Sequence, residues 1–174
     1  MSDRSLQNKR VLVTQANAFM GPALCEVFAA HGATVIADAQ SLLSPGAVAS
    51  MVAVAGRVDV LIANLAILAP TTKVTQVSEE EWNDTFAALV HPLPRLFQAV
   101  LPSMIERRAG KILVMGSASA LRGMKQASTY SAARGAQLAY AQAVGVEVAI
   151  HNVQVNAIAP VSYTHLTLPT KRIV

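Results

Sequence analysis

Three side chains that can take part in proton transfer lie in the second half of the chain. Ser117 ends the apolar run KILVMG, Tyr130 comes thirteen positions later, and Arg134 follows after four more. Tyr130 and Arg134 are four residues apart, so they share one face of a helix. A guanidinium beside a phenol favours the phenolate and makes the tyrosine a usable base, while a serine alongside can hold a substrate oxygen. The spacing therefore predicts an acid–base site with these three residues as its catalytic groups.

A second candidate site follows the first apolar run, KRVLVT. In a doubly wound fold, the loop at this place binds dinucleotide phosphates with its main-chain N–H groups and needs glycines for a tight turn. Of the expected glycines only Gly21 is present, and Gln15 and Phe19 occupy positions that should carry no side chain. We expect the Phe19 ring to take the space that a phosphate or nicotinamide needs; the alternative is that it fills the core of an ordinary loop. Asp38 lies where an acid would hold an adenosine ribose, but without the glycines a cap or surface role is preferred.

Short β-branched runs alternate with longer alanine-rich stretches, which is typical of a parallel sheet with helices on both faces. The strands lack a clean period of two, as strands buried on both faces do. We therefore expect an α/β fold: a Rossmann-like, doubly wound parallel sheet in three α/β/α layers, truncated at its C-terminus. Strands are predicted at residues 10–14, 34–38, 58–64, 111–117 and 153–158, and helices near 21–31, 45–55, 79–107 and 129–148.

The last fourteen residues, VSYTHLTLPTKRIV, show neither helical nor strand periodicity over a useful length. They resemble a translated sequencing adapter, so we leave them out of the fold prediction. The expected organisation is one incomplete Rossmann-like domain over residues 1–160 and a non-native tail over residues 161–174.

The composition excludes several classes of protein. Hydrophobic residues make up 53% of the chain and charged residues 14%, which excludes a disordered chain, yet no apolar run approaches a membrane helix. Cys25 is the one cysteine and the N-terminus lacks a signal peptide, so we expect a cytoplasmic protein. Aromatic residues are 5% of the chain and no basic cluster is longer than two residues, which argues against nucleic-acid binding. No His, Cys, Asp or Glu set has the spacing of metal ligands, and we expect no metal.

The order of strands and helices, together with Ser117-x12-Tyr130-x3-Arg134, resembles the short-chain dehydrogenase/reductase superfamily over residues 9–160. Some features depart from the reductase pattern. The lysine that would hold the nicotinamide ribose is Arg134, and the usual Asn-Asn-Ala-Gly reads Ala-Asn-Leu-Ala at residues 63–66. The segment between positions 38 and 58 is too short for the usual additional strand and helix.

Within this superfamily, Thr14-x4-Phe19-x-Gly21 together with the serine, tyrosine and arginine spacing is similar to the halohydrin dehalogenases, with stretches like those of the B-type members. The resemblance implies a protein that has lost its nicotinamide cofactor. It also implies a halide and substrate pocket that involves Thr14, Phe19, Gly21 and Pro160.

The resemblance implies a lyase that converts a vicinal halohydrin into an epoxide, and the reverse opening of epoxides by halide or other small anions. Tyr130 would take the hydroxyl proton, Arg134 would hold Tyr130 near its phenolate, and Ser117 would hydrogen-bond the substrate oxygen. The expected partners are the small-molecule halohydrin or epoxide and halide, and the superfamily implies a homotetramer for the full-length parent. The alternatives are an NAD(P)-dependent reductase, which needs the same serine and tyrosine, and a non-catalytic binding or scaffold subunit.

Overall fold

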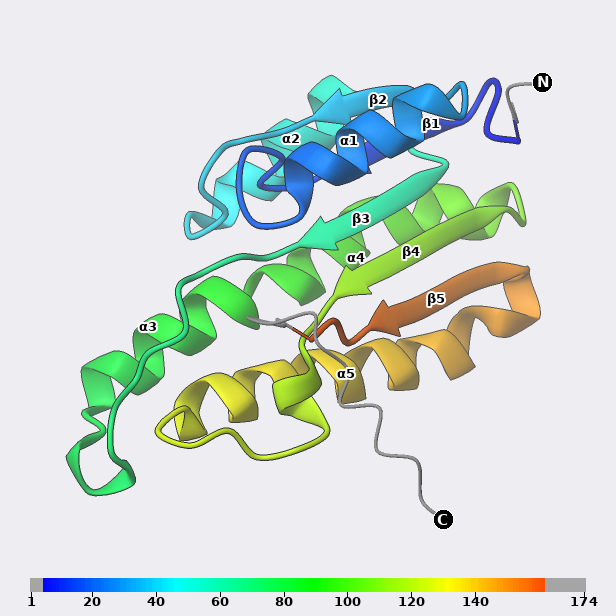
Figure 1. The fold of residues 1–174 in the computed structure, drawn as a ribbon. Helices are drawn as coiled ribbons and strands as arrows, with labels where there is room; N and C mark the ends of the chain where they lie inside the picture. The colour runs from blue at the N-terminus through cyan, green and yellow to red at the C-terminus, as the bar shows by residue number, and fades with distance from the viewer. Residues whose placement is uncertain (1–4, 162–174) are drawn as a thin grey trace, which may run out of the picture.

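Five short strands form one parallel sheet in the order β2-β1-β3-β4-β5 in the computed structural model, which describes residues 5–161. Parallel pairing requires each connection to cross the sheet, and helices make these crossings (Figure 1). The predicted Rossmann-like α/β fold is confirmed. The strands are β1 (Arg10–Val13), β2 (Thr34–Ala37), β3 (Val60–Asn64), β4 (Gly110–Met115) and β5 (Val153–Ile158); the helices are α1 (Gly21–Ala30), α2 (Pro45–Ala55), α3 (Glu79–Leu89), α4 (Pro92–Glu106) and α5 (Ser128–Val148).

The strands separate two hydrophobic cores because successive side chains point to opposite faces of the sheet. Leu12, Leu61 and Ile112 face the larger core, which α2, α4 and α5 close. Val11 and Ile62 face the smaller core, which α1 covers. Figure 1 shows α1 in front of the sheet and α2 and α4 behind it, and α5 packs on the same core as α2 and α4, so the described residues build three layers.

The predicted helix over residues 79–107 is two helices in the structure, and this part of the prediction is wrong. Ser78 caps α3, its side chain accepting a hydrogen bond from the Glu81 N–H as the sequence pattern indicates. The helix ends at Leu89, and Pro92 begins α4. Proline has no N–H for the hydrogen bond that would continue α3, whereas it fits the first turn of a new helix.

The order of the strands determines where a site can form. The chain runs from β1 to β2 on one side of β1 and then crosses to β3 on the other side. The loops that follow β1 and β3 therefore lead in opposite directions and separate at the carboxyl ends of these two strands. Ligands of doubly wound proteins bind at such a switch point. Over residues 5–161, no helix has the length and apolar character needed to cross a membrane, and no group of acidic, histidine and cysteine side chains is arranged to hold a metal ion.

Candidate active site

Ser117 lies just beyond the carboxyl end of β4, in extended backbone that precedes a short 3₁₀ turn. Its Oγ accepts hydrogen bonds from the N–H of Ser119 at 3.2 Å and from the Ser119 hydroxyl at 3.1 Å. A hydroxyl has one proton and two lone pairs. With Ser119 donating to its lone pairs, the Ser117 O–H is left to donate to a substrate oxygen.

Tyr130 lies in the first turn of α5 and lines the same pocket as Ser117. The side chain is 8% exposed, so its ring packs in the core while the pocket reaches it from the carboxyl edge of the sheet. The pocket holds about 240 Å³, and Pro160, just after β5, forms part of its wall. The structure thus brings Ser117, Tyr130 and Pro160 to one cavity.

Arg134 lies one turn after Tyr130 and is 1% exposed. Its guanidinium carbon lies 4.9 Å from the centroid of the Tyr130 ring, and Nη1 donates to Met115 O and to Gln137 Oε1, each at 2.9 Å. Burial lowers the pKa of Arg134 from its ordinary value, and the nearby Tyr130 only partly offsets this. Arg134 is therefore a buried cation against the face of the tyrosine ring, fixed to the end of β4.

Gln137 is a member of this network that the sequence analysis missed. It is completely buried, and its Nε2 donates to the Leu89 carbonyl at 2.6 Å, at the end of α3. Through Gln137, the guanidinium of Arg134 is held between β4, α3 and its own helix. The sequence signal that could have identified Gln137 is its place three residues after Arg134, because residues three apart share one face of a helix.

The loop between β1 and α1 has the main-chain shape of a phosphate-binding turn. Gln15 and Phe19 have φ angles of 44° and 54°, a left-handed conformation usually left to glycine. At Gly21 a Cβ atom would lie 2.6 Å from the Ala16 carbonyl oxygen, so glycine is needed where the loop enters the helix. Within residues 5–161, no acceptor is found for the N–H groups of Phe19 and Met20, which lie at the start of α1, the kind of position where main-chain N–H groups can bind an anion.

Two buried side chains at the carboxyl ends of β1 and β3 hold this loop. Asn64 is completely buried, and its Nδ2 donates to the carbonyls of Gln15 at 3.0 Å and Ala18 at 2.9 Å. The Gln15 side chain bonds in turn to the segment after β3, where its Oε1 accepts a hydrogen bond from the Ala66 N–H at 2.6 Å. Thr14 is also completely buried, and its hydroxyl donates to the Asn64 carbonyl at 3.0 Å. Thr14 and Gly21 thus shape the loop from within, and neither lines the pocket of Ser117.

The Phe19 side chain is 52% exposed, so it does not fill the core of the loop. It is also absent from the lining of the pocket beside Pro160. Asp38 directly follows β2, where its carboxylate accepts from the N–H and the side-chain amide of Gln40, each at 3.1 Å. Its main chain bonds to Ala16, which places this acid beside the loop.

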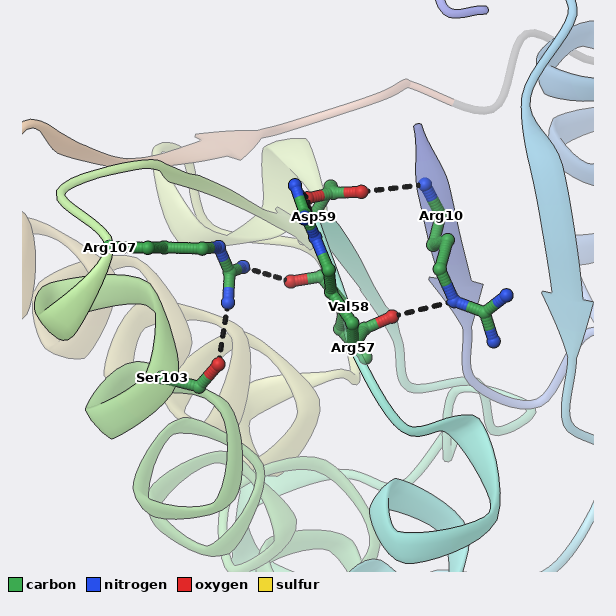
Figure 2. Close-up of polar contacts among 6 residues, drawn as sticks. All are labelled: Arg10, Arg57, Val58, Asp59, Ser103 and Arg107. Carbon is green, nitrogen blue, oxygen red and sulfur yellow. Dashed lines mark hydrogen bonds and ion pairs between the residues drawn. The ribbon is translucent and has the colours of Figure 1, made fainter. Parts of the chain in front are cut away.

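A separate polar cluster lies at the opposite, amino edge of the sheet (Figure 2). Asp59 accepts from the Arg10 N–H at 3.0 Å and pairs with the Arg57 guanidinium at 2.9 Å, while Arg107 donates to the carbonyl of Val58 and to Ser103. Burial alone would raise the pKa of Asp59, but the hydrogen bonds and positive charges around it lower it. This cluster ties β1, β3 and α4 together and is remote from Ser117.

Comparisons with known proteins identify relatives of this chain. The family model of short chain dehydrogenases matches residues 44–168. The 3-oxoacyl-(acyl-carrier-protein) reductase FabG of Vibrio harveyi is 28% identical over 181 residues, covering 90% of this chain and 74% of that protein. The 5-keto-D-gluconate 5-reductase of Escherichia coli (strain K12) is 37% identical over 105 residues, covering 60% of this chain and 41% of that protein.

Two solved structures have a similar fold. One, named a dehalogenation enzyme, superposes with a TM-score of 0.82 at 27% identity and covers 88% of this chain and 72% of its own. The other is a 3-oxoacyl-(acyl-carrier-protein) reductase from Brucella melitensis with bound NAD, with a TM-score of 0.85 at 19% identity over 92% of this chain and 73% of its own. At 19% identity, the second likeness is one of fold.

The prediction that the site uses no nicotinamide cofactor is wrong. The family model and the reductase matched over 90% of this chain point to NAD(P), and a protein of the same fold holds NAD. The prediction gave decisive weight to the residue types of the β1–α1 loop. Main-chain N–H groups bind the phosphates in such a loop, and those of Phe19 and Met20 have no acceptor within residues 5–161.

Proposed function

Because the chain belongs to the short-chain dehydrogenase family, we propose that it is an NAD(P)-linked oxidoreductase that interconverts a small alcohol and the corresponding carbonyl compound. The observation that carries the proposal is the shared pocket of Ser117 and Tyr130, at the edge of the sheet where the β1–α1 loop offers free N–H groups. The N–H groups of Phe19 and Met20 would hold the pyrophosphate. Asp38 would accept from the adenosine ribose, which favours NAD over the 2′-phosphorylated form.

Tyr130 is the acid–base group in this proposal. In reduction its hydroxyl gives a proton to the carbonyl oxygen of the substrate, and in oxidation its phenolate takes a proton from the alcohol. Ser117 donates a hydrogen bond to the same oxygen and fixes its position. Arg134 places a positive charge against the face of the Tyr130 ring. The nicotinamide, when bound, supplies or accepts the hydride.

The test is the oxidation of NADH and NADPH with a panel of small ketones and aldehydes. Tyr130→Phe removes only the hydroxyl oxygen, and we expect kcat to fall by about 10² to 10⁴. Tyr140→Phe is the matched control, because the Tyr140 ring packs against Phe97 at 5.3 Å and is absent from the pocket lining. Full activity in Tyr130→Phe, or no oxidation by wild-type protein with any member of the panel, would contradict the proposal.

Conversion of a vicinal halohydrin into an epoxide is a second candidate activity. It is supported by the likeness to the dehalogenation enzyme at 27% identity. Tyr130 would take the hydroxyl proton, and the resulting alkoxide would displace halide from the neighbouring carbon, with Ser117 holding the oxygen. Halide release from a simple chlorohydrin that is lost in Tyr130→Phe would support this activity. No release from wild-type protein would refute it.

A further inference from the structure

The pocket of Ser117 and Tyr130 has a polar inner end, apolar walls and a cationic mouth. Ala69, Pro160 and Met124 contribute apolar wall. Arg122 also lines it and is the one charged side chain to do so within the described part of the chain. A molecule whose oxygen lies between Ser117 and Tyr130 therefore extends past apolar groups toward a guanidinium.

Arg122 is free to bind a ligand. Its side chain is exposed and has no hydrogen bond or ion pair with any of residues 5–161, while its main-chain N–H donates to the Ala118 carbonyl at 3.1 Å and fixes the turn. By contrast, Arg134 in the same region is buried and bonded to Met115 and Gln137. A guanidinium presents parallel N–H donors that match the two oxygens of a carboxylate.

The surroundings of Arg122 strengthen its positive field. An adjoining hollow shares Met124 with the pocket and is lined by Lys73 and Lys125. Neither hollow has an acidic residue among its described lining. Glu81 reaches α5 nearby, but its carboxylate accepts from the Thr129 hydroxyl at 3.0 Å. An anion that enters the pocket thus meets positive charge without a competing carboxylate in its walls.

We propose that the substrate of this pocket is a small oxo or hydroxy acid whose carboxylate binds Arg122 while its carbonyl or hydroxyl oxygen lies between Ser117 and Tyr130. This inference rests on the proposed function, and it adds the chemical class of the substrate. A volume of about 240 Å³ fits a molecule with a short carbon chain between the two polar ends. Arg122 is then a specificity-determining residue that selects a charged substrate over its neutral analogue.

The experiment compares levulinate with its methyl ester, a pair that shares the ketone and differs in charge. Binding of each to the whole chain is measured by isothermal titration calorimetry, and turnover by the loss of NADH absorbance. We expect wild-type protein to bind levulinate more tightly than the ester. Arg122→Gln should weaken levulinate binding by about twofold to fivefold, as for an ion pair open to solvent, and leave ester binding unchanged.

A matched control separates the contact from a change in net charge. Arg108→Gln makes the same substitution next to the amino end of β4, where the Arg108 side chain bonds to the Ile150 carbonyl. Levulinate binding by this variant should stay close to that of wild type. In turnover, Arg122→Gln should raise KM for levulinate more than it lowers kcat, because the contact is present in both the ground and the transition state.

The two claims fail in different ways. The inference is overturned if Arg122→Gln binds levulinate as tightly as the wild type does. It is also overturned if the wild-type protein binds levulinate no more tightly than the ester. Oxidation of NADH with the ester would not rescue it, since that result supports only the proposed function. If wild-type protein binds levulinate through Arg122 but oxidises NADH with no carbonyl compound, the proposed function fails while the carboxylate site stands. Equal loss of binding in Arg108→Gln would also overturn the inference.

Discussion

A double-mutant cycle can measure the buried hydrogen bond between Arg134 and Gln137. The two side chains are 1% and 0% exposed, and Nη1 lies 2.9 Å from Oε1. Arg134→Met and Gln137→Leu remove the polar ends and keep side chains of similar size. Because the bond is buried and one partner is charged, we expect a coupling free energy of about 1.5–3 kcal/mol.

The single variants should differ in stability. Arg134→Met removes the guanidinium donor of the Met115 carbonyl and of the Gln137 amide oxygen, which costs about 1–3 kcal/mol for each buried acceptor left unpaired. Removing a buried charge offsets part of this cost, since burial already disfavours the charged form of Arg134. We expect the free energy of unfolding to fall by about 2–4 kcal/mol in Arg134→Met and by about 1–3 kcal/mol in Gln137→Leu, where the Leu89 carbonyl loses its donor.

The assay is urea unfolding followed by far-ultraviolet circular dichroism for the wild type, the two single variants and the double variant. The double variant should be less destabilised than the sum of the single variants by the coupling free energy. Activity should separate the two residues, because Arg134→Met removes the cation beside Tyr130 whereas Gln137→Leu retains it. A coupling below about 0.5 kcal/mol, the scatter of independent sites, would refute the assignment of Arg134 and Gln137 to one network.

Other predictions concern charge and glycine positions. Asp59 has a pKa below its ordinary value in the folded protein, so its stabilising effect is present above about pH 4 and is lost as the pH falls through the folded pKa. Asp59→Asn should therefore have a lower free energy of unfolding than the wild type at neutral pH. In acid, the free energies of unfolding of the two proteins should converge. Gly21→Ala places a methyl group against the main chain of the loop, so NADH fluorescence titration should show weaker binding, and unchanged affinity would refute this role. Gly110→Ala drives a methyl group into a buried methionine of α4 and should lower the free energy of unfolding by about 1–3 kcal/mol. Gly135→Ala, in open space on α5, should raise the free energy of unfolding by about 0.5–1 kcal/mol. Thermal unfolding of both variants tests this, and a Gly110→Ala protein more stable than Gly135→Ala would contradict it.

The sequence was most informative about elements whose local pattern and burial agree. The strand predicted at residues 153–158 has the same bounds as β5, and the helix predicted at 45–55 has the same bounds as α2. The break between α3 and α4 was missed because apolar residues continue across it, although Pro92 is a residue that begins helices. The missing N–H of Pro92, and not the spacing of hydrophobic residues, determines that boundary.

The site was less predictable because its geometry depends on contacts between distant residues. The spacing of Tyr130 and Arg134 indicated that the two meet, since a helix fixes that distance. The left-handed backbone at Phe19 lies in a loop that Asn64 holds from another strand, and no local pattern encodes that contact. The bond from Gln137 to Leu89 likewise joins residues 48 positions apart.

The central claim is hydride exchange at the pocket of Ser117 and Tyr130, and transfer of an isotopic label tests it most directly. Wild-type protein is incubated with methyl levulinate and NADH that carries deuterium at both C4 positions of the nicotinamide, and the product alcohol is examined by NMR. We expect deuterium on the carbinol carbon, and formation of this product that is slower by about 10² to 10⁴ with Tyr130→Phe. An unlabelled alcohol, or no alcohol from the wild-type protein with this or any other carbonyl compound, would contradict it.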